Sequence, residues 1–237
     1  MTVGRRRHDA GTALGTAVPG SGPAPEIRVC EALAPVVPFD RAAVALASGP
    51  DCRSYLRGSD RSLTRFGDLQ QTLGEGPELD VLVTDDVVLV DDLRADRRRW
   101  PALSRRASQA VGLSRLLMVP LGGDRGTPPL GLLAVARSGA TFGLRDIELV
   151  TALGRLVTLS LVTRWARSAA AGEELLDLDP DDVSLAVGVL MARSNVVAAT
   201  ATEILRAGAL DRGTTLREEA VRVLGDGPYR RRPGARA

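Results

Sequence analysis

Residues 113–137 read LSRLLMVPLGGDRGTPPLGLLAVAR, and their pattern indicates the centre of the fold. Two apolar runs, 113–121 and 130–137, flank a centre rich in glycine and proline. Apolar runs of this length, bounded by turn residues, are typical of buried strands. We therefore expect two strands joined by a flexible hairpin loop.

Shorter apolar runs before this hairpin extend the predicted sheet. Residues 42–47 (AAVALA) end at a Ser-Gly-Pro turn, and a run at 54–58 would pair with them as a second hairpin. Residues 87–90 indicate a short buried strand, and residues 101–111 a helix with its arginines outward. Strands alternating with helices predict a mixed domain built around one sheet.

Composition excludes several kinds of chemistry. The 237 residues carry 31 basic side chains, all of them arginine, against 29 acidic ones. Without lysine there is no Schiff base or P-loop lysine, and the single histidine, His8, excludes histidine triads and histidine-rich metal sites. Cys30 and Cys52 lack C-x-x-C spacing, so we expect reduced structural thiols. We expect no catalytic residues, no metal and no cofactor, and hence no enzyme.

No segment predicts a membrane span. The most apolar stretch, 147–162, contains Glu148 and Arg155 and is too short to cross as an uninterrupted apolar run. Residues 1–25 are broken by glycine and proline and lack the apolar core of a signal peptide. We interpret them as a flexible arm and expect a cytoplasmic protein.

Four landmarks in order carry a resemblance to a known family. They are LQQTLGEGP at 69–77, VLVDDL at 88–93, RWP at 99–101 and MVPL at 118–121. This series resembles the GAF domain of actinobacterial signalling proteins over roughly residues 30–165. The resemblance implies an α+β fold with an antiparallel sheet and an unidentified small ligand. Glu78 stands where relatives often have cysteine, so no thiol-based redox sensing is expected there.

A long helix is predicted from Leu144 to about Ala171. It carries two apolar stripes, one through Ile147, Val150, Gly154, Val157 and Leu161, the other through Leu149, Leu153 and Leu156. One stripe can pack on the sheet, and the other is left for a partner helix. We expect a second copy of the chain there, although both stripes could also pack within one chain.

The C-terminal part predicts three short helices. The first begins at Asp179-Pro180, with Val183, Ala186, Val187, Leu190 and Met191 on one face. The second, from about Ala198, directs Ala201, Ile204, Leu205 and Gly208 inward and ends at Gly213. The third begins with the capping box Thr215-x-x-Glu218 and buries Leu216, Ala220, Val223 and Leu224. A bundle of about fifty residues is too small to be an enzyme by itself.

This part resembles the ANTAR domain, an RNA-binding three-helix module, over about residues 176–224. The resemblance rests on AVGVLMAR at 186–193, on Ala201, Leu205-Arg206 and Ala209, and on Gly213, Leu216 and Ala220. It implies a dimer that binds paired RNA hairpin loops and prevents transcription termination. The candidate RNA-binding residues are Ala186, Gly188, Met191, Arg193, Arg206, Arg212 and Arg217.

The chain thus divides into five expected segments. They are an arm at 1–25, a GAF-like sensor domain at 26–143, a connecting and dimerisation helix at 144–175, an ANTAR-like module at 176–226 and a basic tail at 227–237.

The negative charge of the C-terminal part and two differences from the usual ANTAR sequence leave a second interpretation open. Residues 173–227 hold five arginines against eleven acids, although RNA binding draws on positive charge. Relatives usually have Gln-Ala-Lys-Gly where this chain has Leu185-Ala186-Val187-Gly188, and often serine at the place of Val197. The alternative is a regulatory dimerisation or protein-interaction protein whose bundle has lost RNA contacts.

Overall fold

The structure is a computed structural model that describes residues 22–37, 39–49, 52–56, 58–106, 113, 115–123, 127–171 and 182–225. Several predicted features lie outside these residues. They are His8 with most of the N-terminal arm, the helix start at Asp179-Pro180, the centre of the 122–129 loop and the basic tail.

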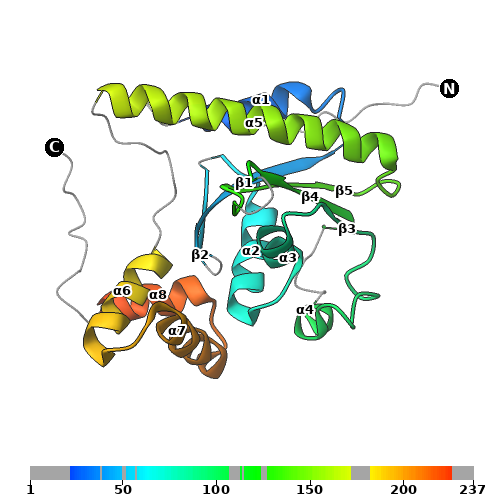
Figure 1. Ribbon diagram of the computed structural model, residues 1–237. Helices are drawn as coiled ribbons and strands as arrows, with labels where there is room; N and C mark the ends of the chain where they lie inside the picture. Colours follow the sequence, from blue (N-terminus) through cyan, green and yellow to red (C-terminus); the bar gives the residue numbers. More distant parts are fainter. Residues whose placement is uncertain are drawn as a thin grey trace, which may run out of the picture.

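One antiparallel sheet of five strands forms the centre of the N-terminal domain, in the order β2-β1-β5-β4-β3 (Figure 1). The strands are β1 (Arg41–Gly49), β2 (Cys52–Tyr55), β3 (Val88–Val90), β4 (Arg115–Leu121) and β5 (Gly131–Arg137). β4 and β5 pair with Leu117 opposite Val135, which confirms the predicted hairpin. β2 pairs with β1 as predicted but begins at Cys52, two residues before the predicted run.

Helices cover both faces of the sheet (Figure 1). α1 (Pro25–Leu33) and α5 (Leu144–Ala171) lie on one face, and α2 (Arg61–Leu73), α3 (Pro77–Thr84) and α4 (Pro101–Arg105) lie on the other. The alternating side chains of the strands supply both cores, with Leu117 facing α5 and Met118 facing α2 and α3. α1 is a helix that the sequence interpretation did not include.

α4 is shorter than the helix predicted at 101–111. It ends at Arg105, and the backbone N–H of Arg106 donates to carbonyl oxygens of the last turn. Residues 107–111, the rest of the predicted helix, lie outside the described residues.

α5 confirms the long predicted helix but divides its apolar residues differently. Val150, Val157 and Leu161 are buried against the sheet, and Leu153 of the second predicted stripe is buried with them. The outward stripe instead contains Leu156 and Leu159, which are 51% and 64% exposed. At about 100° per residue, Leu153 lies within about 60° of Val150 and Val157 and shares their face, whereas Leu156 lies about 100° or more from both and points outward.

The C-terminal bundle consists of α6 (Asp182–Ser194), α7 (Ala198–Arg212) and α8 (Leu216–Gly225). Its core is small and apolar, and its fully buried members are Ala186, Ala201, Ala209, Leu216 and Ala220. The predicted capping box is present, since Thr215 and Glu218 each accept the backbone N–H of the other. Gly213 ends α7 with a φ of 65°, as predicted.

Two residues expected inside the bundle are outside it. Met191 and Ile204 are 37% and 43% exposed. α7 is rotated so that Thr202 and Arg206 are buried instead, and Arg206 packs against α2 of the N-terminal domain. The prediction was wrong because it treated the three helices as packing only against one another.

Among the described residues, no single helix is long and apolar enough to cross a membrane; α6 and α7 meet that test only when joined, across a bend of 108°.

Candidate functional site

A buried polar cluster lies where β2 meets the turn between α2 and α3. Arg53 and Tyr55 alternate along β2 and therefore project from the same face of the sheet, toward the core beneath α2 and α3. Glu78, in the first turn of α3, completes the cluster. The Oε2 atom of Glu78 lies 3.1 Å from the Nε atom of Arg53, and it accepts a hydrogen bond from the Tyr55 hydroxyl at 2.8 Å.

The cluster is closed to solvent. The side chains of Arg53 and Glu78 have no exposed surface, and neither Nη atom of Arg53 has a hydrogen-bond partner within the described residues. Gln70 adds a link to α2, because its Oε1 atom accepts the backbone N–H of Glu78 at 2.8 Å. Separating a fully buried charge pair leaves an uncompensated charge in the interior, which is strongly destabilising, so this arrangement couples β2, α2 and α3 tightly.

Two glycines make room for the cluster. A Cβ atom on Gly67 would lie 1.5 Å from the Tyr55 hydroxyl, so α2 approaches β2 only because position 67 has no side chain. A Cβ atom on Gly76 would lie 2.4 Å from Oε1 of Gln70, and the φ of 146° at this residue also favours glycine. The GEGP turn is thus a structural element of the cluster.

Burial dominates the electrostatics of the cluster. It raises the pKa of Glu78, while the Arg53 guanidinium and the Tyr55 hydroxyl oppose that rise. Burial and the neighbouring Glu78 carboxylate raise the pKa of Tyr55 well above its ordinary value. Cys30, on the far face of the sheet, has its pKa raised to about 12 by burial and is therefore an unreactive thiol.

The turn at Gly74–Pro77 was predicted from the sequence, but the buried cluster was not. Arg53 and Tyr55 lie at alternate positions of a short strand, and Glu78 was noted only as a replacement for cysteine. A charged residue on the inward face of a strand was the available signal. The pairing of Arg53 with Glu78 joins residues 25 positions apart, which no local pattern reveals.

The C-terminal bundle contacts the N-terminal domain at α2. The Nε atom of Arg206 donates to the carbonyl oxygen of Gln71 at 3.1 Å, and the side chain is almost fully buried. The backbone N–H of Leu216 donates to the Thr72 hydroxyl at 2.8 Å. Arg217 lies 3.8 Å from the carboxylate of Asp68. Figure 1 shows the bundle beside this end of α2.

The structure distributes the candidate RNA-binding residues over several environments. Ala186 is fully buried in the bundle core, whereas Gly188 and Met191 are exposed on the outer side of α6. Arg193, at the end of α6, is exposed. Arg206 and Arg217 come together at the contact with α2. The seven residues therefore do not form one continuous surface in this conformation.

Arg212 belongs to an ion-pair network inside the bundle. It donates two hydrogen bonds to Glu219, at 2.7 and 2.9 Å, and Arg222 binds the same carboxylate. These hydrogen bonds lower the pKa of Glu219 to about 2. A Cβ atom on Gly208 would lie 2.6 Å from the Glu219 carboxylate, so this glycine admits the pair.

The acidic excess of the C-terminal part does not lie on the described helices. Residues 182–225 contain five arginines, at 193, 206, 212, 217 and 222, and five acids, at 182, 203, 211, 218 and 219. The excess lies in 173–181 and at Asp226. The bundle itself is neutral, so its charge opposes RNA binding less than the whole segment suggests.

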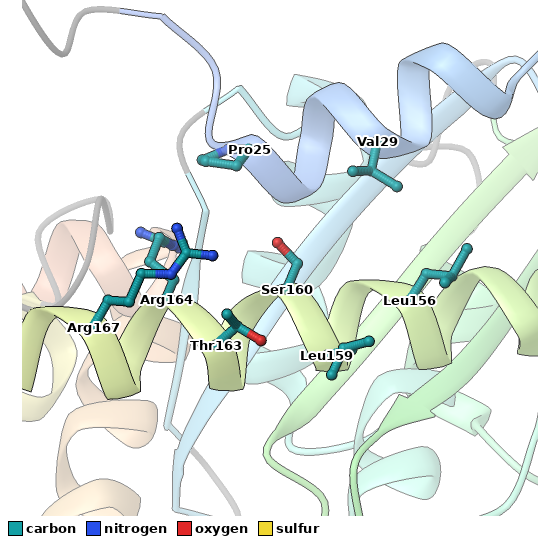
Figure 2. Close-up of a pocket in the computed structure, with 8 residues that line it drawn as sticks. All are labelled: Pro25, Val29, Leu156, Leu159, Ser160, Thr163, Arg164 and Arg167. Atoms are coloured by element: carbon teal, nitrogen blue, oxygen red, sulfur yellow. The ribbon is translucent and has the colours of Figure 1, made fainter.

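A groove of about 420 Å³ runs between α1 and α5 on the outer face of the molecule (Figure 2). Leu156 and Leu159 line one part of it, and Arg164 and Arg167 lie at one end. Ser160 and Arg164 both bind the buried carboxylate of Glu26, which fastens α1 to α5. Within the described residues, no group of three histidine, cysteine or acidic side chains could hold a metal ion.

Comparison with known proteins identifies the N-terminal part. The family model of the GAF domain matches residues 27–161. The solved structures that are similar to the chain include a GAF domain region of a putative membrane protein from Geobacter sulfurreducens, with 16% identity and a TM-score of 0.43. That match covers 58% of this chain and 93% of the other.

Two further solved structures have similar sequence identities, TM-scores and coverages. A domain of a putative two-component sensor histidine kinase from Sinorhizobium meliloti has 15% identity and a TM-score of 0.45, covering 63% of this chain and 95% of the other. The GAF domain of a phosphoenolpyruvate-protein phosphotransferase from Coxiella burnetii has 17% identity and a TM-score of 0.39, covering 60% and 81%. No curated protein matches the chain.

Proposed function

The chain belongs to the GAF domain family, and we propose that it is a cytoplasmic, non-enzymatic regulator that senses a small ligand and controls transcription by RNA antitermination. The GAF domain gives the protein a signal-sensing regulatory role. The observation that carries the proposal is the direct contact of this domain with a second, three-helix module through Arg206 and Leu216. Such a contact lets the state of the sensor affect the module.

RNA binding is the proposed output. It is supported by the resemblance of residues 176–224 to the ANTAR domain, whose expected helix order matches α6, α7 and α8. Arg193 is exposed on the bundle, and guanidinium groups both stack on unpaired bases and hydrogen-bond to them. The neutral charge of residues 182–225 is compatible with contacts to splayed loop bases, which depend less on phosphate neutralisation.

Homodimerisation is the second part of the proposal. Outward positions of α5 recur at alternating intervals of four and three residues, which is the spacing of a coiled-coil seam. They are Ala152, Leu156, Leu159, Thr163, Ala166 and Ala170. A second copy of α5 has the complementary spacing by symmetry, and small residues at both ends of the stripe allow close approach. A dimer would bring two bundles to two RNA hairpins.

Binding to RNA tests the proposal directly. Filter binding of the full chain to a two-hairpin RNA, compared with a scrambled RNA at about 50 mM salt, should show preference for the hairpins. Arg193→Ala should weaken that binding roughly tenfold, as expected for loss of one base contact. Arg145→Ala is the matched control, because Arg145 is an exposed arginine of α5 in the GAF domain. Equal binding of both RNAs would contradict RNA recognition.

A protein-interaction role is the alternative, and one observation favours it. The bundle exposes several large apolar side chains, namely Leu185, Met191, Val197, Ile204, Leu210 and Val221. Exposed apolar surface of this kind is more typical of protein contacts than of RNA contacts. If Leu185→Lys and Val197→Ser strengthened RNA binding while a protein partner was lost, the alternative would be the better description.

A further inference from the structure

We propose that residues 68–74, the end of α2 and its cap Gly74, form an autoinhibitory clasp, which holds the C-terminal bundle against the GAF domain and covers Arg206 and Arg217. This inference concerns the regulation of the proposed RNA-binding module and, for its consequence on RNA, rests on that function. The clasp itself is a contact between the two domains, and it is tested without RNA.

The first element of the clasp receives Arg206. The last turn of a helix presents carbonyl groups without partners and a partial negative charge, and a guanidinium is attracted to both. Arg206 donates to one of these carbonyls, that of Gln71. Gly74, which ends α2 with a φ of 71°, leaves the space for it, since a Cβ atom there would lie 3.1 Å from the guanidinium carbon.

The second element receives the start of α8. The first N–H groups of a helix have no partner within that helix, and here the N–H of Leu216 finds one in the other domain. The Thr72 hydroxyl donates to the carbonyl of Asp68 at 2.7 Å, which directs its lone pairs outward to accept Leu216. Leu216 and Thr72 are both buried, so water does not replace this hydrogen bond in the closed state.

The third element is electrostatic. Asp68 lies 3.8 Å from the guanidinium of Arg217, and both side chains are partly buried. Two of the four arginines that the sequence assigns to RNA recognition thus contact the GAF domain. A nucleic acid cannot reach Arg206 in this arrangement without separation of the bundle from α2.

The clasp is continuous with the buried cluster. Within the same helix, Gly67 contacts Tyr55 and the Gln70 side chain accepts the N–H of Glu78, while Thr72 and the Gln71 carbonyl bind the bundle. One short stretch of α2 therefore touches both the sensor interior and the output module. A displacement of α3 or β2 is transmitted to the bundle through α2, without passing through α5.

The variant Thr72→Val tests the clasp. It retains the shape of the side chain and removes the acceptor of the Leu216 N–H, so the closed state loses a buried hydrogen bond. The matched control is Thr84→Val on α3, because the Thr84 hydroxyl also donates to the carbonyl four residues earlier but is exposed and lies outside the clasp. Circular dichroism and thermal unfolding establish that both variants fold.

Two readouts on the full chain do not depend on RNA. One is the distance distribution between spin labels at the exposed positions Val83 and Ala207, in a chain with Cys30 and Cys52 replaced by alanine. The other is labelling of Arg206 by a phenylglyoxal reagent, quantified by mass spectrometry. We expect one short distance and little labelling in the parent chain and in Thr84→Val. In Thr72→Val we expect longer distances and labelling of Arg206 raised roughly tenfold.

The outcomes separate the clasp from the proposed function. The clasp would be overturned if the parent chain showed the same broad spin-label distances and the same Arg206 labelling as Thr72→Val, whether or not either chain binds RNA. Opening by Thr72→Val together with a roughly tenfold gain in hairpin RNA affinity would support both the clasp and RNA binding. Opening without RNA binding by either chain would support the clasp and refute the proposed RNA function.

Discussion

Arg53 and Glu78 form an ion pair that is fully enclosed in the GAF domain, with Nε of the arginine 3.1 Å from Oε2 of the glutamate. The two residues come from an edge strand and from the first turn of α3, so the pair fixes the GEGP turn to the sheet. The same turn follows the helix that contacts the C-terminal bundle. A local charge pair is thereby linked to the position of another module.

Replacement of Glu78 by glutamine should strongly destabilise the protein. The uncharged amide leaves the Arg53 guanidinium as a buried charge without a counter-ion, which costs about 3–5 kcal/mol. Urea unfolding measures the change. Asp80→Asn is the control, because Asp80 forms an exposed ion pair with Arg99 and should cost less than about 1 kcal/mol. Equal small effects of both substitutions would show that the buried pair is not important for stability.

Gly67→Ala should destabilise the GAF domain, whereas Gly188→Ala should not. The new methyl group at position 67 would lie 1.5 Å from the Tyr55 hydroxyl, so α2 must move away from β2. Overpacking of this kind costs about 1–3 kcal/mol or more. Gly188 is an exposed helical glycine with open space where a methyl group would lie, and alanine there should stabilise α6 by about 0.5–1 kcal/mol. Thermal melting of both variants distinguishes the two sites, and stabilisation at position 67 would contradict the close approach.

Acidic pH should destabilise the C-terminal bundle by protonating the Glu219 carboxylate. Its pKa is lowered to about 2 in the folded state, so its carboxylate stabilises the fold above the ordinary glutamate pKa. That contribution is lost as the pH falls from about 5 toward 2. Urea midpoints measured across this range should fall more steeply for the parent chain than for Glu219→Gln, which has no such proton to bind. Parallel curves would refute the ion-pair network of Glu219 with Arg212 and Arg222.

Leu159→Glu should separate the proposed dimer. Leu159 is 64% exposed on the outward stripe of α5. In a symmetric dimer, a glutamate at this position in each copy would place two negative charges near each other across the seam, and they would repel. Light scattering should give twice the chain mass of 25.0 kDa for the parent and the single mass for Leu159→Glu. Val83→Glu, on the exposed side of α3, should remain dimeric. A monomeric parent chain at micromolar concentration would contradict dimerisation by α5.

The elements that sequence patterns predicted are those with local signals. The β4 and β5 hairpin, the long α5 and the caps at Thr215 and Gly213 all depend on residues close in the chain. Those features followed from apolar runs, helical periodicity and turn chemistry. The GAF landmarks predicted a family that the comparison confirms.

The features that were missed depend on contacts distant in sequence. Arg206 was predicted to contact RNA, but it is buried because α2 supplies the carbonyl of Gln71, 135 positions away. Ile204 is exposed for the same reason, since the rotation of α7 that buries Arg206 turns Ile204 outward. No periodicity within α7 contains information about the second domain against which it packs.

The identity of the RNA that the protein carries in cells tests the proposed antitermination function most directly. The full chain and its Thr72→Val variant would be crosslinked in cells of the source organism and purified, and the attached RNA sequenced against a mock purification. We expect enrichment of paired hairpin loops that precede terminators, with more RNA recovered from Thr72→Val than from the parent. Sequences indistinguishable from the mock in both samples would contradict the proposed function.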